Sequence, residues 1–158
     1  MIRLTPFNQK PGFCGPIALR VVLAYYGVTL SEEKLVKFCK TTPKEGTWHK
    51  DLVAAARAME FSVYEKAGGT IEELKKYIVK KIPVIVGWYA FNDDHYSVIY
   101  NITDAYIHTV DTEGHLKERK RHMSIKHFKE MWFDYDNPKN PEEKTFGWFM
   151  VVTPKENA

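Results

Sequence analysis

The sequence of 158 residues lacks the features of several large classes of protein. It holds only two cysteines, Cys14 and Cys39, which are too few for a small secreted domain held together by disulfides. Its longest uncharged apolar run, residues 82–91, is far shorter than a membrane-spanning helix, which needs about 20 residues. The N-terminal segment contains no apolar run of signal-peptide length. We therefore expect a soluble, cytoplasmic protein with no membrane span.

The charge of the chain is too weakly one-sided to indicate a nucleic-acid partner. Its net charge is +3 and its isoelectric point is about 8.7. The densest basic run, residues 117–122, is interrupted by Glu118 and contains no aromatic residue, so a solvated hairpin is the better interpretation. No CxxC or HxxxH pair occurs, so we expect no metal and no cofactor. His49, near a predicted helix start, is expected at the surface.

Apolar spacing and capping residues predict helices first and then mostly strands. The composition, 44% hydrophobic and 27% charged, is that of a globular chain, and the length suits one domain over residues 1–158. The predicted helices cover about 15–26, 31–38, 50–59 and 70–81, with a short one over 124–133. The predicted strands cover 83–88, 95–100, 106–110, 116–121 and 147–152, with a turn at Gly114 and a polar loop over 137–144. This order predicts an α+β fold with helices packed against one antiparallel sheet.

Cys14 stands at the start of the first predicted helix, between Phe13 and Gly15. Unpaired N–H groups and positive potential at a helix N-terminus stabilise a thiolate, so a cysteine there can be reactive at neutral pH. Gly15 would leave space for a substrate to approach. The backbone N–H of Cys14 and the side-chain amide of Gln9 are candidate donors to an oxyanion. A buried, inert cysteine is the competing interpretation of this position.

His95 and Asp111 are the residues that favour the reactive interpretation. A thiolate nucleophile needs a base, usually histidine, that a third group orients. His95 begins one predicted strand and Asp111 ends the next. An antiparallel pairing centred near residue 103 places 95 opposite 111, where the carboxylate can fix the imidazole tautomer and leave the second ring nitrogen for Cys14. The order of cysteine, histidine and polar orienter is that of papain-like enzymes.

Several segments together resemble the bacteriocin-processing, double-glycine leader peptidases, which are papain-like cysteine peptidases. The active-site segment is Gln9-Lys10-Pro11-Gly12-Phe13-Cys14-Gly15-Pro16-Ile17-Ala18-Leu19, continuing to Ala24-Tyr25-Tyr26-Gly27. The other segments are Gly46-Thr47 with Leu52 and Ala55-Ala56, then Pro83-Val84-Ile85-Val86, His95-Tyr96-Ser97-Val98-Ile99-Tyr100 and Val110-Asp111. The family often has Asp-Pro where this chain has Asp111-Thr112.

The resemblance implies a papain-like fold and a cysteine peptidase that uses no metal or organic cofactor. It implies that Cys14 is the nucleophile, His95 the general base and acid, Asp111 the orienting residue and Gln9 an oxyanion donor. Many family members precede the membrane and ATP-binding domains of a transporter, and this sequence shows neither, so we expect a stand-alone peptidase acting on a peptide or protein. The family prefers to cleave after small residues such as Gly-Gly.

Two other functions use the same residues differently. An acyl transferase or amidase would pass the Cys14 acyl group to an amine. A non-catalytic module would keep the fold and bind peptides, although such a module would more often have lost one of the four site residues.

The remaining candidates have simpler interpretations. Cys39 lies four residues after Leu35 and is predicted to fill the core, with a disulfide to Cys14 disfavoured. Asp93 and Asp94 either cap the loop before the strand or favour the imidazolium form of His95, and capping is the simpler interpretation. Residues 88–91 are either one wall of a substrate groove or a core tryptophan followed by an exposed loop.

Overall fold

The computed structural model describes residues 1–8, 10, 12–111 and 120–156. Three helices come first: α1 (Cys14–Tyr25), α2 (Glu32–Phe38) and α3 (His49–Ala58). They are followed by β1 (Phe61–Lys66), α4 (Ile71–Val79), β2 (Val84–Ala90), β3 (Asp93–Ile102) and β4 (Tyr106–Val110). The chain ends with β5 (Lys120–Ser124), α5 (Ile125–Met131), β6 (Phe133–Asp134), β7 (Thr145–Phe146) and β8 (Phe149–Pro154). No helix in the described part of the chain is long and apolar enough to cross a membrane.

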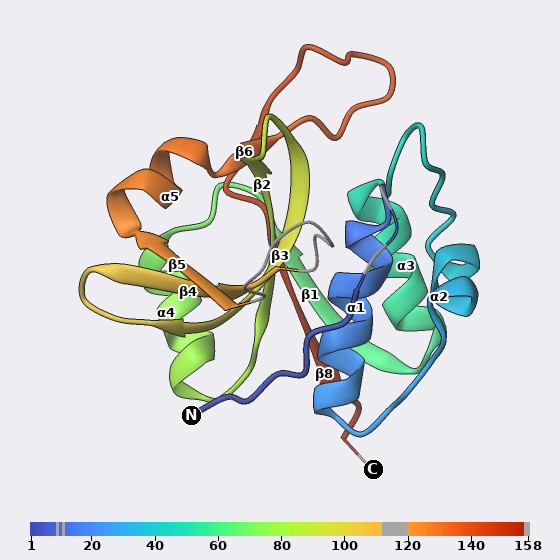
Figure 1. The fold of residues 1–158 in the computed structure, drawn as a ribbon, viewed down its shortest axis with the longest axis horizontal. Helices are drawn as coiled ribbons and strands as arrows, with labels where there is room; N and C mark the ends of the chain where they lie inside the picture. Colours follow the sequence, from blue (N-terminus) through green and yellow to red (C-terminus); the bar gives the residue numbers. More distant parts are fainter. Residues whose placement is uncertain (9, 11, 112–119, 157–158) are drawn as a thin grey trace.

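The predicted α+β fold is confirmed, with an antiparallel sheet in the order β1-β8-β2-β3-β4-β5. Figure 1 shows α1, α2 and α3 grouped on one side of the sheet and α4 and α5 on the other. The predicted caps form: the hydroxyls of Ser31, Thr70 and Ser124 each accept a hydrogen bond from the backbone N–H three residues later. Each of these three helices therefore begins where its capping residue predicts.

Two apolar clusters cover the two faces of the sheet, because successive side chains of a strand point to opposite faces. Ile85, Val98 and Met150 face the cluster shared with α1 and α3. Val86 and Ile99 face the cluster shared with α4 and α5. A central sheet that is apolar on both faces holds its strand ends rigidly, which matters because the site residues lie at one such end.

Three strands were not predicted, and one prediction falls partly outside the described residues. β1 forms the edge of the sheet and pairs with β8 over Phe61↔Pro154 to Lys66↔Phe149, a contact between distant parts of the chain. β6 and β7 have two residues each and pair only with one another. The predicted turn at Gly114 and most of the predicted strand 116–121 lie outside the described residues, and β5 begins at Lys120.

Candidate active site

Cys14 is the first residue of α1 and is partly exposed, as the sequence predicts for a reactive position. The glycine that follows it has a different role from the one expected. A Cβ built on Gly15 would lie 2.6 Å from the Thr47 hydroxyl oxygen, so Gly15 makes room for Thr47 and not for a substrate. Thr47 is in turn hydrogen-bonded to Thr41 at 2.6 Å. The start of α1 is thereby fixed against the segment that precedes α3.

His95 lies near the beginning of β3 and is buried, and its Nε2 lies 3.0 Å from Asp111 Oδ1. The predicted strand register was wrong by two residues: Val98 pairs with Val110, which places Asp111 across from Ser97 instead of His95. A β-bulge near Tyr100 accompanies this shift. His95 nevertheless contacts Asp111, because residues 95 and 97 lie on the same face of β3 and both side chains reach the Asp111 carboxylate.

Asp111 is completely buried, and within the described part of the chain three side chains donate hydrogen bonds to it. The donors besides His95 are the hydroxyls of Ser97, at 2.6 Å, and Thr109, at 2.9 Å. Ser97 is itself fixed by the indole N–H of Trp88 at 2.8 Å. Burial raises the pKa of Asp111, but the hydrogen bond and charge of His95, with the two hydroxyls, hold it below its usual value. Asp111 is therefore a rigid, negatively charged partner of the imidazole.

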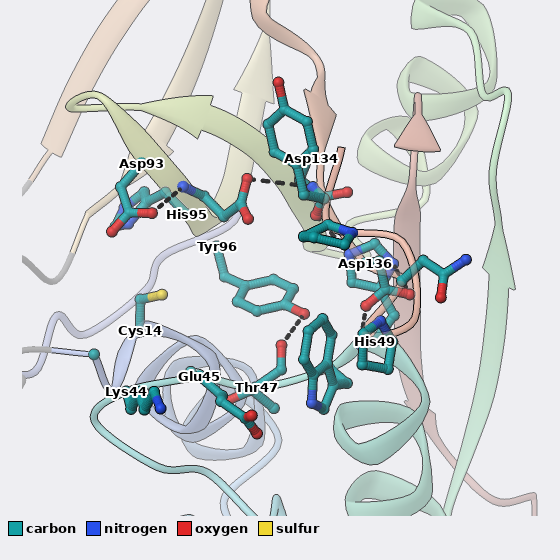
Figure 2. A pocket seen from close by; sticks show the side chains of 18 of the residues that line it. Cys14, Lys44, Glu45, Thr47, His49, Asp93, His95, Tyr96, Asp134 and Asp136 are labelled. Atoms are coloured by element: carbon teal, nitrogen blue, oxygen red, sulfur yellow. Dashed lines mark hydrogen bonds and ion pairs between the residues drawn. The ribbon is translucent and has the colours of Figure 1, made fainter. Parts of the chain in front are cut away.

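His95 interacts with Cys14 as well as with Asp111, to which it is hydrogen-bonded. Because Nε2 bonds the carboxylate, Nδ1 is the ring nitrogen left for the thiol. Burial disfavours the charged imidazole, yet the hydrogen bonds to Asp111 and Cys14 outweigh burial and raise the pKa of His95 to about 10. In Figure 2 the Cys14 side chain points toward His95 from the other side of the cleft. The predicted meeting of Cys14, His95 and Asp111 is thus present.

A cleft of about 500 Å³ opens beside Cys14 and His95. Figure 2 shows Lys44, Glu45 and Thr47 on the same side as Cys14, and Asp93 and Asp134 on the side of the sheet. The two sides are joined deeper in the cleft, where the Tyr96 hydroxyl donates a hydrogen bond of 2.7 Å to the Thr47 carbonyl. Cys14 and His95 both line this cleft, so a ligand bound there would lie beside them.

A second buried histidine lies on the same cleft and was not predicted. His49 Nε2 lies 2.5 Å from Asp134 Oδ2, and its Nδ1 lies 3.1 Å from Asp136 Oδ2. Its ring stacks on Trp148 with centroids 3.9 Å apart. The expectation that His49 lies at the surface was wrong, because its side chain is only 5% exposed. Gly87 of β2 leaves the space that the His49–Asp134 pair occupies, since a Cβ there would collide with Asp134.

Nothing in the local sequence marks this second cluster. The partners of His49 are more than 80 residues away and come together only through the β6 segment and the start of α3. The His49 backbone N–H also donates to Asp136 Oδ1 at 2.8 Å, which ties the helix start to the segment after β6. The sequence hints at this cluster only by placing two aspartates, Asp134 and Asp136, two residues apart.

Asp93 and Asp94 accept hydrogen bonds from backbone N–H groups, which agrees with the capping interpretation. Asp93 Oδ1 accepts the backbone N–H of Asp94 at 2.8 Å, and Asp94 Oδ1 accepts that of Tyr135 at 3.3 Å. Burial, and next the charge of Asp134, raise the pKa of Asp94 to about 6. Trp88 is a core residue, and Phe91 is partly exposed in the turn that follows.

The remaining candidates are placed as follows. Gln9 lies outside the described residues. Cys39 is buried in the core as predicted, burial and the charge of Asp51 raise its pKa to about 12, and both cysteines are free. Within residues 1–8, 10, 12–111 and 120–156, no group of three or more His, Cys, Asp or Glu could hold a metal ion.

Several solved structures that share this fold are peptidases or peptidase domains. The peptidase domain of Streptococcus ComA, a bifunctional ABC transporter involved in quorum sensing, is 22% identical, with 98% of this chain and 100% of that chain covered and a TM-score of 0.74. A double-glycine-motif protease from an AMS/PCAT transporter, in complex with the leader peptide, is 19% identical, with 98% and 94% covered and a TM-score of 0.71. A C39-like peptidase from Bacillus anthracis is 15% identical, with 99% and 98% covered and a TM-score of 0.71.

No curated protein matches the chain. Residues 7–135, by contrast, match the Peptidase C39 family, and this range contains Cys14, His95 and Asp111. The match covers most of the chain and agrees with the resemblance seen in the sequence. The chain therefore belongs to the Peptidase C39 family and is a cysteine peptidase.

Proposed function

We propose that this chain hydrolyses a peptide bond through a thioester formed on Cys14. The observation that carries the proposal is the position of His95, which interacts with the partly exposed Cys14 and is hydrogen-bonded to the buried Asp111. A histidine held between a thiol and a buried carboxylate can store a proton and return it. The partly exposed position of Cys14 at the start of α1 gives a substrate carbonyl access to its sulfur.

The reaction follows in two steps. The Cys14 thiolate attacks the carbonyl carbon, and the backbone N–H of Cys14 with the Gln9 amide donates to the oxyanion. The C–N bond breaks as the His95 imidazolium gives its proton to the leaving amine. Neutral His95 then takes a proton from water, whose oxygen attacks the thioester carbon. The C–S bond breaks, which releases the carboxylic acid product and restores the Cys14 thiolate beside the His95 imidazolium. Asp111 keeps Nε2 occupied throughout, so that Nδ1 makes each transfer.

We propose that the substrate is a peptide cleaved after small residues such as Gly-Gly. The support is the family and the fold shared with a double-glycine-motif protease whose structure holds a leader peptide. The cleft of about 500 Å³ beside Cys14 offers a place for such a peptide.

The test compares Cys14→Ala with Cys39→Ala on a set of peptides that carry Gly-Gly before the cut. Cys14→Ala should abolish turnover, whereas Cys39→Ala should keep the turnover of its folded fraction because Cys39 lies in the core. Equal loss from both variants would contradict the proposal.

Alkylation by iodoacetamide tests the same pair without a substrate. We expect Cys14 to be labelled rapidly near pH 6 and its labelling to be slowed by His95→Ala, while native Cys39 stays unlabelled. Mass mapping follows each cysteine separately. If Cys14 is labelled only above about pH 8.5, in the manner of a free thiol, the proposal fails.

A further inference from the structure

Two side chains that the proposed mechanism does not use pack against the His95–Asp111 pair. The Phe91 ring meets the His95 imidazole edge to face, with centroids 5.3 Å apart and planes at 85°. The guanidinium carbon of Arg121 lies 4.8 Å from the centroid of the same Phe91 ring. Arg121 Nη1 also lies 3.9 Å from Asp111 Oδ2. Arg121 therefore contacts Asp111 directly and His95 through Phe91.

The backbone at Phe91 indicates that its ring is held there for a reason other than the fold. Phe91 and Asn92 form the two-residue turn between β2 and β3, with φ of 56° and 61°. Such turns favour asparagine and glycine, because a bulky residue is strained in the left-handed region. Phe91 is 39% exposed, and the covered part of its ring packs between the His95 imidazole and the Arg121 guanidinium. A strained residue beside a reactive group is typical of a functional position.

Arg121 is placed by the pairing of β4 with β5. Arg121 stands opposite Thr109, the residue whose hydroxyl donates to Asp111 Oδ2. Its Nη1 is buried, and within the described part of the chain it has no hydrogen-bond acceptor. The interaction with Asp111 is therefore one of charge at close range, and its effect depends on the positive charge more than on bond geometry.

We propose that Arg121 is a positioning residue that acts on His95 through Asp111 and Phe91. This proposal rests on the proposed function. The carboxylate of Asp111 stabilises the charged imidazolium of His95, and the positive charge of Arg121 reduces that stabilisation. His95 therefore releases its proton to the leaving amine more readily. The Phe91 ring, covered by the guanidinium, fixes the imidazole plane and keeps water away from that side. Among the described residues, the titratable groups that interact directly with His95 are Cys14 from α1 and Asp111 after β4, and Arg121 of β5 reaches it through Asp111 and Phe91.

The first experiment measures kcat and KM against pH for Arg121→Gln, Arg121→Lys and Lys120→Gln. Lys120 is the matched control, because it is the adjacent cation in β5 and faces Tyr100 at 5.7 Å instead of Asp111. Removing a cation near the imidazolium favours its charged form. Arg121→Gln should therefore lower kcat about 10-fold with little change in KM, and move the alkaline limb of kcat upward by about half a pH unit.

Arg121→Lys should restore the alkaline limb but only part of kcat, since an ammonium keeps the charge and loses the flat stacking surface. Lys120→Gln should change neither quantity. The proposal is overturned if Arg121→Gln leaves the alkaline limb where it is in the parent enzyme, or moves it no more than Lys120→Gln does.

A measurement without turnover separates this proposal from the proposed function. In a Cys14→Ala background, the Cε1–H signal of His95 can be followed by NMR, with His95→Ala used to assign it. Adding Arg121→Gln should raise the titration midpoint of His95 by about half a unit, whether or not the chain cleaves any peptide tried. An unchanged midpoint would contradict the role proposed for Arg121 and would leave the proposed peptidase function unaffected.

Phe91→Asn distinguishes positioning from stability. Asparagine tolerates the left-handed conformation, so this variant should need more urea to unfold than the parent does. It should nevertheless lower kcat several-fold, because the ring beside His95 is lost. If Phe91→Asn is more stable than the parent and has the same kcat, the positioning role proposed for Phe91 is refuted.

Discussion

Two buried histidines line the same cleft, His95 and His49, and they differ in the groups that their ring nitrogens contact. Both are nearly inaccessible to solvent, and both contact a buried aspartate at 3.0 Å or less. His95 has one ring nitrogen on Asp111 and the other side of its ring facing Cys14. His49 has both ring nitrogens against carboxylates and its face against Trp148.

The difference lies in what the second ring nitrogen meets. A histidine acts as acid and base when one nitrogen is oriented by a carboxylate and the other reaches a reacting group. When carboxylates occupy both nitrogens, the ring becomes a cross-link, here between the start of α3 and the segment after β6. His49 therefore supports the wall of the cleft, and His95 is the histidine to which the proposed mechanism assigns proton transfer.

The largest expected effect tests the proposed role of His95 in proton transfer by activity. His95→Ala should lower kcat/KM by about 10³-fold or more while the folded state persists, since it removes the proton carrier. His108→Ala, at a half-buried histidine of β4, serves as the control and should keep full activity. Steady-state kinetics on a peptide that the parent cleaves makes the measurement, and substantial activity in His95→Ala would refute the contrast.

The second effect appears in stability. His49→Asn should cost about 3 kcal/mol at pH 7, because it leaves Asp134 and Asp136 without their shared partner. Burial already raises the pKa of Asp136, so the penalty should shrink as acid neutralises the carboxylates. Urea unfolding at pH 7 and pH 4.5 measures both. A cost below 1 kcal/mol at pH 7 would mean that the cross-link is dispensable.

The third effect concerns the orienting carboxylate of His95. Asp111→Asn should lower kcat about 10²-fold, since a neutral amide cannot stabilise the imidazolium. The Asp111 hydrogen bond contributes to the pKa of His95 of about 10, so the alkaline limb of activity should fall by at least about one unit. The pH profile of kcat/KM checks this, and an unmoved limb would contradict the role given to Asp111.

The smallest effect tests the acidic wall near His49. Burial and the charge of Asp134 raise the pKa of Asp94 to about 6. The folded state therefore binds this proton more tightly than the unfolded chain, and stability falls as pH rises from about 4 to about 6. Asp94→Asn, which keeps an acceptor for the Tyr135 N–H, should gain about 1 kcal/mol above pH 6, after allowance for its exposure. The gain should vanish below pH 4 in urea titrations, and a gain that persists there would have another cause.

Several helix starts, and the meeting of His95 with Asp111, could be predicted because the residue patterns that indicate them are local. Ser31, Thr70 and Ser124 mark helix starts through hydrogen bonds that reach only three residues. His95 and Asp111 lie on adjacent antiparallel strands, so a short connection brings them together. Even there, the register could not be predicted, because it depends on where the hairpin turns, with Ile102 opposite Ile107, and on a bulge near Tyr100.

The sequence by itself determined the order of helices and strands and placed a cysteine at a helix start with a histidine and an aspartate on neighbouring strands. Only the tertiary structure decided that β1 joins β8, that Gly15 admits Thr47, and that His49 is enclosed by Asp134 and Asp136. The physical reason is range. Caps and alternation act over a few residues, whereas those contacts join segments tens of residues apart whose meeting depends on packing of both faces of the sheet.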